Sequence, residues 1–320
     1  MLPLVVDLDG TLIHSDTLHE SSIKFLKDSP ASVFLIPFWL AAGKVNLKRQ
    51  IADRTTLDVK TLPYNEAFMC WLRNQRSAGR YITLCSATHR SIAQSVADHL
   101  QLFDEVIATE NDINLSGERK AAALRARYGE KGFAYAGNAV SDIKVWEIAA
   151  EVIVVNAEKD LLALARKRFE VTEVFHAPVV QLATWRKAVR LHQWLKNLLL
   201  FLPLLAAHQI LNLEAWGILC IAFFAFSLCA SAVYLANDLL DLESDRLHPR
   251  KKHRPFASGA LPLWTGVALV PVLLTASFGL ASFLNAAFLG WLAAYFLLTC
   301  FYSWTLKRLI ELPLLPRTRS

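Results

Sequence analysis

An acidic motif directly follows a long uncharged segment in the second half of this 320-residue chain. Its polar side chains belong to Asn237, Asp238, Asp241 and Asp245. Asn237, Asp241 and Asp245 recur every four residues, which would align them on one face of a helix, and Asp238 can join that face. Carboxylates crowded in this way repel one another unless a divalent cation holds them together. The motif therefore predicts a site for a divalent cation, with Asp241 and Asp245 as its catalytic carboxylates.

Basic residues follow the motif at once, and their charge suits phosphate groups. They are Arg246, Lys251, Lys252 and Arg254. A metal held by carboxylates, beside cations that hold phosphates, would neutralise a departing pyrophosphate. Ionising a prenyl C–O bond and displacing pyrophosphate from an activated sugar both require this neutralisation. The alternative is a solvated helix at a membrane surface that carries ordinary cytoplasmic cations.

A second set of chemically active side chains lies in the first half of the chain. Apolar runs at 2–6, 81–85, 105–108, 133–136 and 152–155 alternate with helical stretches, which predicts a doubly wound parallel α/β sheet. Sites in such sheets collect where the strands end. The polar residues near those ends are Asp7, Asp9, Ser86, Asn138 and Asp142, and Lys120 precedes a helix expected to begin near Ala121.

These residues closely resemble the haloacid dehalogenase superfamily of phosphatases over about residues 2–156. The run 7–12 (D-L-D-G-T-L) matches its first motif, Ser86 its second, Lys120 its third and 137–142 its fourth. The resemblance implies that Asp7 attacks phosphorus and that Asp9 is the general acid/base. It also implies that Ser86 and Lys120 hold the phosphoryl group, while Asp142 helps Asp7 and Asp9 to bind Mg²⁺. One departure is Asn138, where that motif commonly has a second Asp, so one carboxylate is lost from the metal site.

The insert at about 15–78 is expected to form a helical cap over this site, with helices near 32–42 and 66–76. A boundary near Pro178 would divide the chain into a hydrolase-type domain, 1–178, and a membrane domain, 179–320. The segment 171–178 is read as the linker between them. A phosphatase-like domain with only a regulatory role is the alternative to an active enzyme.

The second half of the chain is typical of a membrane protein. Between residues 256 and 306 it contains no Asp, Glu, Lys, Arg or His. Apolar stretches at about 194–213, 215–236, 263–284 and 286–306 predict an all-α bundle of about four spans, since roughly 20 residues cross a bilayer. The first stretch is the weakest, because Lys196, Pro203 and His208 interrupt it.

The distribution of charge predicts the topology of these spans. Lys and Arg gather before the first span, between the second and third, and after the fourth, where Lys307 and Arg308 lie. The four spans should then cross the inner (plasma) membrane with both the start of the first span and the end of the fourth on the cytoplasmic side. The net charge of +6 is explained by these clusters, so we expect no nucleic-acid partner. Five cysteines without a C-x-x-C pair indicate a reduced protein without a disulfide framework.

The motif at 237–259 (N-D-x-x-D-x-x-x-D-x-x-H-P-x-K-x-x-R-P-x-A-S-G) is similar to the first signature of the UbiA-type intramembrane prenyltransferase superfamily. Residues 190–197 and 302–308 agree with its decaprenyl-phosphate phosphoribosyltransferase branch. The resemblance covers about 183–308. It implies that Asn237, Asp238, Asp241 and Asp245 bind Mg²⁺–diphosphate and that Lys196 and Arg254 contact phosphate; Lys251 is a further candidate phosphate contact from the basic run. In that branch a polyprenyl phosphate or diphosphate is a substrate, with phosphoribosyl pyrophosphate as its partner.

Members of that superfamily usually have about nine spans and a second Asp-rich motif. Beyond Asp245, Glu311 is the one acidic residue of this sequence, so no second acidic cluster is expected. We therefore expect the N-terminal part of such a domain, either a shortened product or a half that a second chain completes. The alternatives are a membrane-tethered phosphomonoesterase whose transferase half is inactive, and a non-catalytic membrane subunit.

Overall fold

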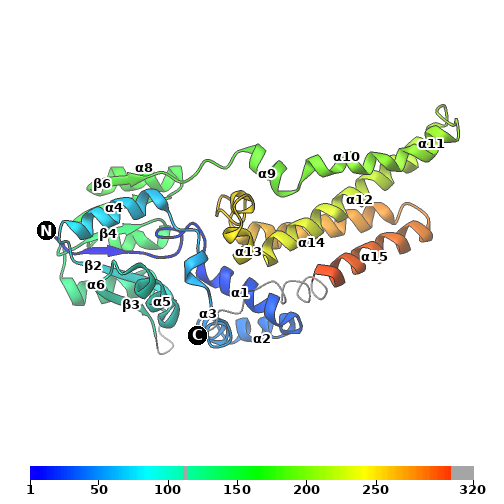
Figure 1. Ribbon diagram of the computed structural model, residues 1–320. Coiled ribbons are helices and arrows are strands. Elements are labelled where there is room, and N and C mark those ends of the chain that lie inside the picture. Colours follow the sequence, from blue (N-terminus) through cyan, green and yellow to red (C-terminus); the bar gives the residue numbers. More distant parts are fainter. Residues whose placement is uncertain (111–113, 304–320) are drawn as a thin grey trace. The chain divides into compact units, whose positions relative to one another are not determined.

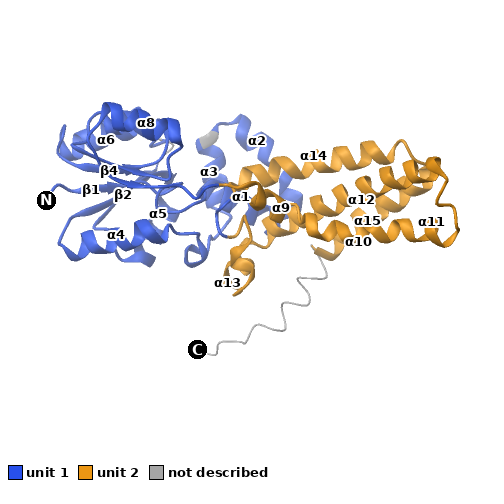
Figure 2. Ribbon diagram, turned by 90° about the horizontal axis from the view of Figure 1, so that it is seen from above, with its two compact units in different colours: residues 1–179, 258–260 blue, residues 180–257, 261–320 orange. Residues whose placement is uncertain are grey.

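A computed structural model describes residues 1–110 and 114–303. The chain forms two compact units, shown in different colours in Figure 2. The first comprises residues 1–179 with 258–260, and the second comprises 180–257 with the residues from 261 onward. The assignment of 1–178 and 179–320 as functional domains stays a prediction.

Six strands of the described chain form one parallel sheet in the first unit (Figure 1). They are β1 (Leu4–Val6), β2 (Ile82–His89), β3 (Glu105–Thr109), β4 (Ala134–Gly137), β5 (Glu151–Val155) and β6 (Val171–Phe175). Their order is β3-β2-β1-β4-β5-β6, and each neighbouring pair is parallel. The strand order therefore reverses between β1 and β4, which is where such sheets place their sites.

Helices cover both faces of this sheet, which confirms the doubly wound fold. On one face, α4 (Glu66–Ser77) and α5 (Arg90–Leu100) bury residues such as Phe68 and Val96 against β1 and β2. On the other, α6 (Glu118–Tyr128), α7 (Ile143–Trp146) and α8 (Lys159–Arg168) enclose a core around Trp146. The two cores fix both sides of β1, whose three residues are all fully buried.

Two predicted features of this unit need correction. The segment 171–178, expected to be a linker, contains strand β6. The strand was not predicted because it is partly exposed and its polar residues Thr172 and Glu173 interrupt the apolar run. Helix α4 lies within the predicted cap segment but packs on the sheet, because Phe68, Met69 and Leu72 enter the core beside β1.

The other helices of the insert form a small cluster of their own. They are α1 (Thr17–Asp28), η1 (Pro30–Phe34), α2 (Ile36–Ala41) and α3 (Lys44–Ala52), whereas η2 (Val59–Thr61) packs against α5 and the core of the sheet. Phe25, Leu47 and Ile51 form their buried centre, with Ile36 and Trp39 packed against it. Asp16 caps α1 by accepting from the amide N–H groups of Leu18 and His19.

In the second unit, α12 (Leu213–Leu240), α14 (Leu263–Ala281) and α15 (Ala286–Phe301) are apolar helices. Within the described residues, α12 and α14 are long and apolar enough to cross a membrane. At 1.5 Å per residue they extend about 42 Å and about 28 Å, against about 30 Å for a hydrocarbon core. The end of the predicted fourth span, with Lys307, Arg308 and Glu311 beyond it, lies outside the described residues.

The stretch expected as the first span is not one continuous α-helix. It contains η4 (Leu191–Gln193), α10 (Trp194–Asn197), η5 (Leu198–Phe201) and α11 (Leu202–Ala206), and it follows α9 (Leu182–Ala188). Pro203 lies in the first turn of α11, where a missing N–H is tolerated, so it begins a new helix and does not extend the old one. Trp194 and Asn197 donate to the hydroxyls of Ser231 and Ser227 on α12 at 2.9 Å.

Small residues allow α12 and α14 to approach each other closely. Ala225 and Cys229 are fully buried on α12, and the hydroxyl of Ser277 on α14 donates to the backbone carbonyl of Ala225 at 2.6 Å. Small side chains and short polar contacts are the usual means of joining apolar helices that lack a hydrophobic driving force between them. After α12, the chain turns through α13 (Leu242–Leu247) and η6 (Lys251–His253).

Candidate functional site

The predicted phosphatase residues meet at the carboxyl ends of β1 and β4. Asp7 follows β1, and its amide N–H donates to the carbonyl of Ala136 in β4 at 3.0 Å. Gly10 turns the chain at a φ of 74°, and a Cβ there would lie 2.0 Å from Nδ2 of Asn138. Glycine is therefore required at this position both for backbone conformation and for space.

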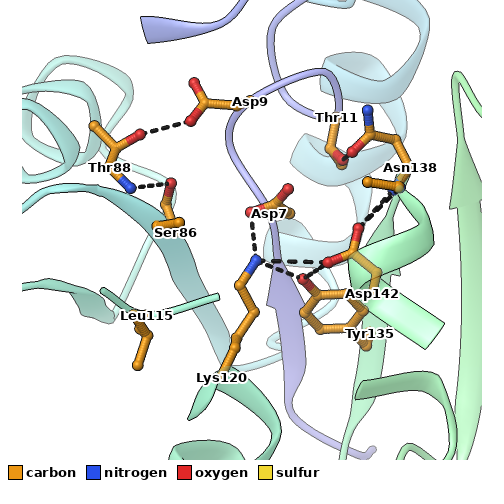
Figure 3. Close-up of polar contacts among 12 residues, drawn as sticks. Asp7, Asp9, Thr11, Ser86, Thr88, Leu115, Lys120, Tyr135, Asn138 and Asp142 are labelled. Carbon is orange, nitrogen blue, oxygen red and sulfur yellow. Dashed lines mark hydrogen bonds and ion pairs between the residues drawn. The ribbon is translucent and has the colours of Figure 1, made fainter. Parts of the chain in front are cut away.

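Asp7 belongs to a buried network of charged and polar groups (Figure 3). Lys120 Nζ donates to Asp7 Oδ1 at 2.8 Å and to the hydroxyl of Tyr135 at 3.0 Å. That hydroxyl donates to Oδ1 of Asp142 at 2.9 Å, and Lys120 lies 3.6 Å from the same oxygen. Oδ2 of Asp142 accepts from the amide N–H groups of Asn138 and Ala139. The side chains at the ends of β1 and β4 are thus joined through one lysine.

Burial raises the pKa of the Asp7 carboxyl to about 7, although Lys120 opposes this increase. The nearby carboxylate of Asp142 adds to the increase. The ionised form of Asp7 is therefore undercompensated by the protein alone.

Asp9 points into a separate polar pocket of the same unit (Figure 3). Its Oδ1 accepts from the amide N–H of Thr17 at 2.8 Å, and its Oδ2 accepts from the hydroxyl of Thr88 at 2.6 Å. Burial, with the nearby Asp16 carboxylate, raises the pKa of Asp9 to about 6. Lys48 of α3 also lines this pocket and donates to the carbonyl of Ala87 at 2.7 Å. Asp9 is thus placed to exchange a proton near neutral pH.

Sequence patterns did not identify every member of this site. Tyr135 and Thr88 were missed, because each lies in or beside an apolar strand whose pattern indicates only burial. Lys120 was expected before its helix but lies in the first turn of α6, which begins at Glu118. Ser86 is fully buried in β2, and its hydroxyl accepts from the amide N–H of Thr88 at 3.1 Å.

The predicted metal ligands do not form a cluster of three in the part of the chain that the structure describes. Both oxygens of Asp142 accept hydrogen bonds from the protein. Asp7 and Asp9, however, are carboxylates whose pKa values are raised by burial and by neighbouring carboxylates. Carboxylate oxygens are the ligands that hard divalent cations such as Mg²⁺ prefer. The role of these residues in binding a metal remains a prediction.

The acidic motif of the second unit is held by arginines. Asp238 accepts at Oδ1 from Arg190 and, at 3.0 Å, from Nη1 of Arg254. The same Nη1 donates to Oδ2 of Asp245 at 2.6 Å. Asp238 and Asp245 are 3% and 1% exposed, so both carboxylates depend on these cations for their charge balance.

The arrangement differs from the predicted column of Asn237, Asp241 and Asp245. Helix α12 ends at Leu240, and Asp241 is the residue between α12 and α13. Asp238 and Asp245, seven positions apart, share Arg254, whereas Asn237 and Asp241 are only half-buried. Asp238 lies in the last turn of α12 and Asp245 in α13, so the break between the two helices at Asp241, and not a helical period, brings both carboxylates to Arg254.

The predicted phosphate ligands occupy different surroundings. Nζ of Lys251 lies 4.0 Å from Oδ1 of Asp245, a buried oxygen that has no hydrogen-bond partner among the described residues. Lys196 is exposed on α10, and no ion pair joins it to the acidic motif in the described ranges. Arg190 belongs to the segment 190–197 that agrees with the UbiA-type branch. Its guanidinium stacks over the ring of Tyr234 at 4.6 Å from the centroid, and its backbone is left-handed with a φ of 51°.

The fold and these two sites define a fusion of a hydrolase-type α/β unit with apolar helices. Residues 4–147 match the haloacid dehalogenase-like hydrolase family, and residues 198–314 match the UbiA prenyltransferase family. The chain therefore contains a haloacid dehalogenase-like domain followed by a UbiA-family region, as the sequence motifs predict.

Several relatives share one or both parts. The uncharacterized protein y4nM of Sinorhizobium fredii is 36% identical over 309 residues, covering 96% of this chain and 60% of that protein. A decaprenyl-phosphate phosphoribosyltransferase of Mycolicibacterium smegmatis is 38% identical over 125 residues, covering 38% of this chain and 39% of that enzyme. The nodulation protein NoeC of Azorhizobium caulinodans is 44% identical over 101 residues, 31% of this chain and 32% of that protein. The chain thus spans at most about three fifths of these relatives.

Replacing Tyr135 by Phe should weaken the first unit, because Lys120 and Asp142 each lose a buried partner. We expect a loss of about 1–3 kcal/mol in the local unfolding free energy. Hydrogen exchange of the β1 and β4 amides in detergent would measure it. Tyr128→Phe is a matched control, since its hydroxyl bonds Thr83 and Glu105 on a half-exposed side chain. Equal losses in the two variants would contradict a special role for Tyr135.

Replacing Arg254 by Met should strongly destabilise the second unit, because two buried carboxylates lose a shared cation. The expected cost is about 3 kcal/mol or more, visible as a lower thermal midpoint in detergent. Adding Asp245→Asn should restore part of that loss by removing one uncompensated charge. Arg250→Met, at an exposed position, controls for loss of positive charge. A further loss on adding Asp245→Asn would show that charge balance is not the cause.

Proposed function

We propose that the second unit carries a Mg²⁺-dependent transferase site of the UbiA type that acts on a polyprenyl phosphate or diphosphate in a membrane. The observation that carries this proposal is the sharing of Arg254 by Asp238 and Asp245 at the end of an apolar helix. Burying two carboxylates costs free energy that folding alone does not require, so a ligand-binding role accounts for them.

The proposed site combines a metal end and a phosphate end. Bound Mg²⁺ would supply charge neutralisation for a diphosphate, and Asp238, Asp241, Asp245 and Asn237 would hold it. The buried, unpartnered Oδ1 of Asp245 is an oxygen suited to such an ion. Arg190 and Arg254 reduce the negative charge of the carboxylates, so that an anionic phosphate can approach them. The proposed phosphate contacts are Lys251, beside Asp245, and Lys196 on α10.

The proposed substrates follow from the named relatives of the second unit. Enzymes called decaprenyl-phosphate phosphoribosyltransferase match 27–38% of this chain at 38–44% identity. We therefore propose phosphoribosyl pyrophosphate as the donor and a polyprenyl phosphate as the acceptor. The reaction would break the C1–O bond to pyrophosphate and form a bond from C1 to the lipid phosphate oxygen. We place the protein in the inner membrane with its first unit in the cytoplasm. A second chain that completes the transferase remains part of this proposal.

A second candidate function is a membrane-tethered phosphomonoesterase. The ion pair of Asp7 with Lys120 favours it, because the ammonium group opposes the increase in pKa that burial causes and so favours the ionised carboxylate needed for attack on phosphorus. Asp9 would give its proton to the departing alcohol and later accept one from water, and Ser86 with Lys120 would hold the phosphoryl oxygens. Under this alternative the transferase half is inactive or depends on a partner.

The transferase proposal predicts a lipid product in membranes that contain the protein. Given phosphoribosyl pyrophosphate, polyprenyl phosphate and Mg²⁺, they should form phosphoribosyl lipid, detected by mass spectrometry. Asp241→Ala should reduce product by about 100-fold or more, as expected when a group that stabilises transition-state charge is lost. No lipid product above the Asp241→Ala background would refute phosphoribosyl transfer by this chain alone.

The phosphatase alternative predicts phosphate release that depends on the first unit only. Asp7→Asn should abolish hydrolysis of a generic phosphomonoester by the purified full chain, because an amide is not a nucleophile for phosphorus. Asp241→Asn should leave that hydrolysis unchanged. Release that survives Asp7→Asn would assign the activity to a contaminant or to another group.

A further inference from the structure

An apolar surface lies on the helical insert of the first unit. Residues 29–43, which include η1 and α2, contain no charged side chain. Phe34 and Phe38 are 75% and 74% exposed. We call this surface the apolar cap face, and its members are Val33, Phe34, Leu35, Phe38 and Leu40, all of them exposed.

Packing within the insert does not account for this surface. Ile36 and Trp39 already supply the inward side of α2, against Phe25, Leu47 and Ile51. A water-facing helix normally carries polar side chains on its outer side. In η1 and α2 the side that faces away from the insert is as apolar as the side that packs against it. Among the described residues, nothing covers this outward side. Contiguous exposed apolar side chains of this kind usually mark a contact with another apolar phase.

The same chain supplies a reason why that phase is a lipid bilayer. Its second unit contains α12 and α14, which are long and apolar enough to cross a membrane. Helix α9 begins at Leu182, three residues after the first unit ends at Val179. Helix α12 follows at Leu213, so the chain tethers the first unit to a helix that can cross a membrane, and an apolar face that reaches the bilayer surface is desolvated by lipid.

The charges around the apolar cap face suit an anionic bilayer. Residues 24–54 contain six Lys or Arg and two Asp. Lys24 and Lys27 precede the uncharged segment, while Arg49 and Arg54 follow it. The Arg54 guanidinium lies 5.1 Å from the ring centroid of Trp39. Cations attract anionic headgroups, and Trp is favoured at the boundary between headgroups and acyl chains.

We propose that the apolar cap face inserts into the interfacial layer of an anionic membrane and anchors the first unit there. Helix α3 lies beneath this face through Leu47 and Ile51, and it also places Lys48 in the pocket lined by Asp9. The anchored helices therefore form one wall of the candidate phosphatase pocket. Lipid contact would fix the position of that wall.

The test uses the full chain in proteoliposomes of phosphatidylglycerol and phosphatidylcholine. Exposed Cys70 and Cys220 and half-buried Cys300 are replaced by Ser, and buried Cys85 and Cys229 are kept. A single new cysteine at position 34 or 38 then carries a polarity-sensitive fluorophore. Lipids with a nitroxide near the headgroup end of the acyl chain should quench it at least about twofold, because interfacial helices reach about 5–10 Å into the bilayer.

The matched control is Ala122→Cys, an exposed position on α6 of the same unit, which lipid nitroxides should leave unquenched. Vesicles of phosphatidylcholine alone should give weaker quenching at 34 and 38. The proposal is overturned if lipid nitroxides quench positions 34 and 38 no more than 122. Quenching by iodide in water would then show a solvated surface, and protection from both quenchers would show a protein partner.

Discussion

An ionised carboxyl group that is removed from water needs a compensating cation, and both polar sites of this chain are organised around that need. In the first unit, Lys120 crosses from α6 to Asp7 and reaches Tyr135 and Asp142 on the way. In the second, Arg254 serves Asp238 and Asp245 together, and Arg190 supports Asp238. In each case one cation is shared among more than one acidic group. The protein thus holds its buried carboxylates in place by sharing cations among them.

This sharing of cations is the feature that connects both sites with the phosphate chemistry proposed for them. Burial raises the pKa values of Asp7 and Asp9, and Oδ1 of Asp245 accepts no hydrogen bond from the described residues. A protein selected only for stability would replace such groups with apolar side chains of similar size. Sites for phosphate and divalent cations retain them because the ligand completes the charge balance. The two units therefore use shared cations in two settings, the carboxyl ends of a parallel sheet and the end of an apolar helix.

The sequence predicts much of this arrangement, but not the contacts that are distant along the chain. Alternating apolar runs located five strands, and the spacing of Asp7, Asp9, Ser86, Lys120 and Asp142 identified the hydrolase-type edge. Helix α12 was predicted as a membrane span because the uncharged run at 215–236 is long enough to cross a bilayer. In contrast, β6 was missed because an edge strand tolerates polar residues, and Arg190 was missed because its partner Asp238 is 48 positions away. The pairing of Asp238 with Asp245 depends on where α12 ends, which local spacing did not determine.

The side chains of Trp194 and Asn197 have a consequence for biosynthesis. Both donate to serines of α12, which is made later than they are. Before α12 emerges from the ribosome, these two donors have no such acceptors, and the short helices around them are interrupted at Pro203. Residues 191–206 are therefore poorly suited to enter a bilayer as an autonomous segment at the translocon. Their stable placement must await the next helix, so the two segments integrate as a pair.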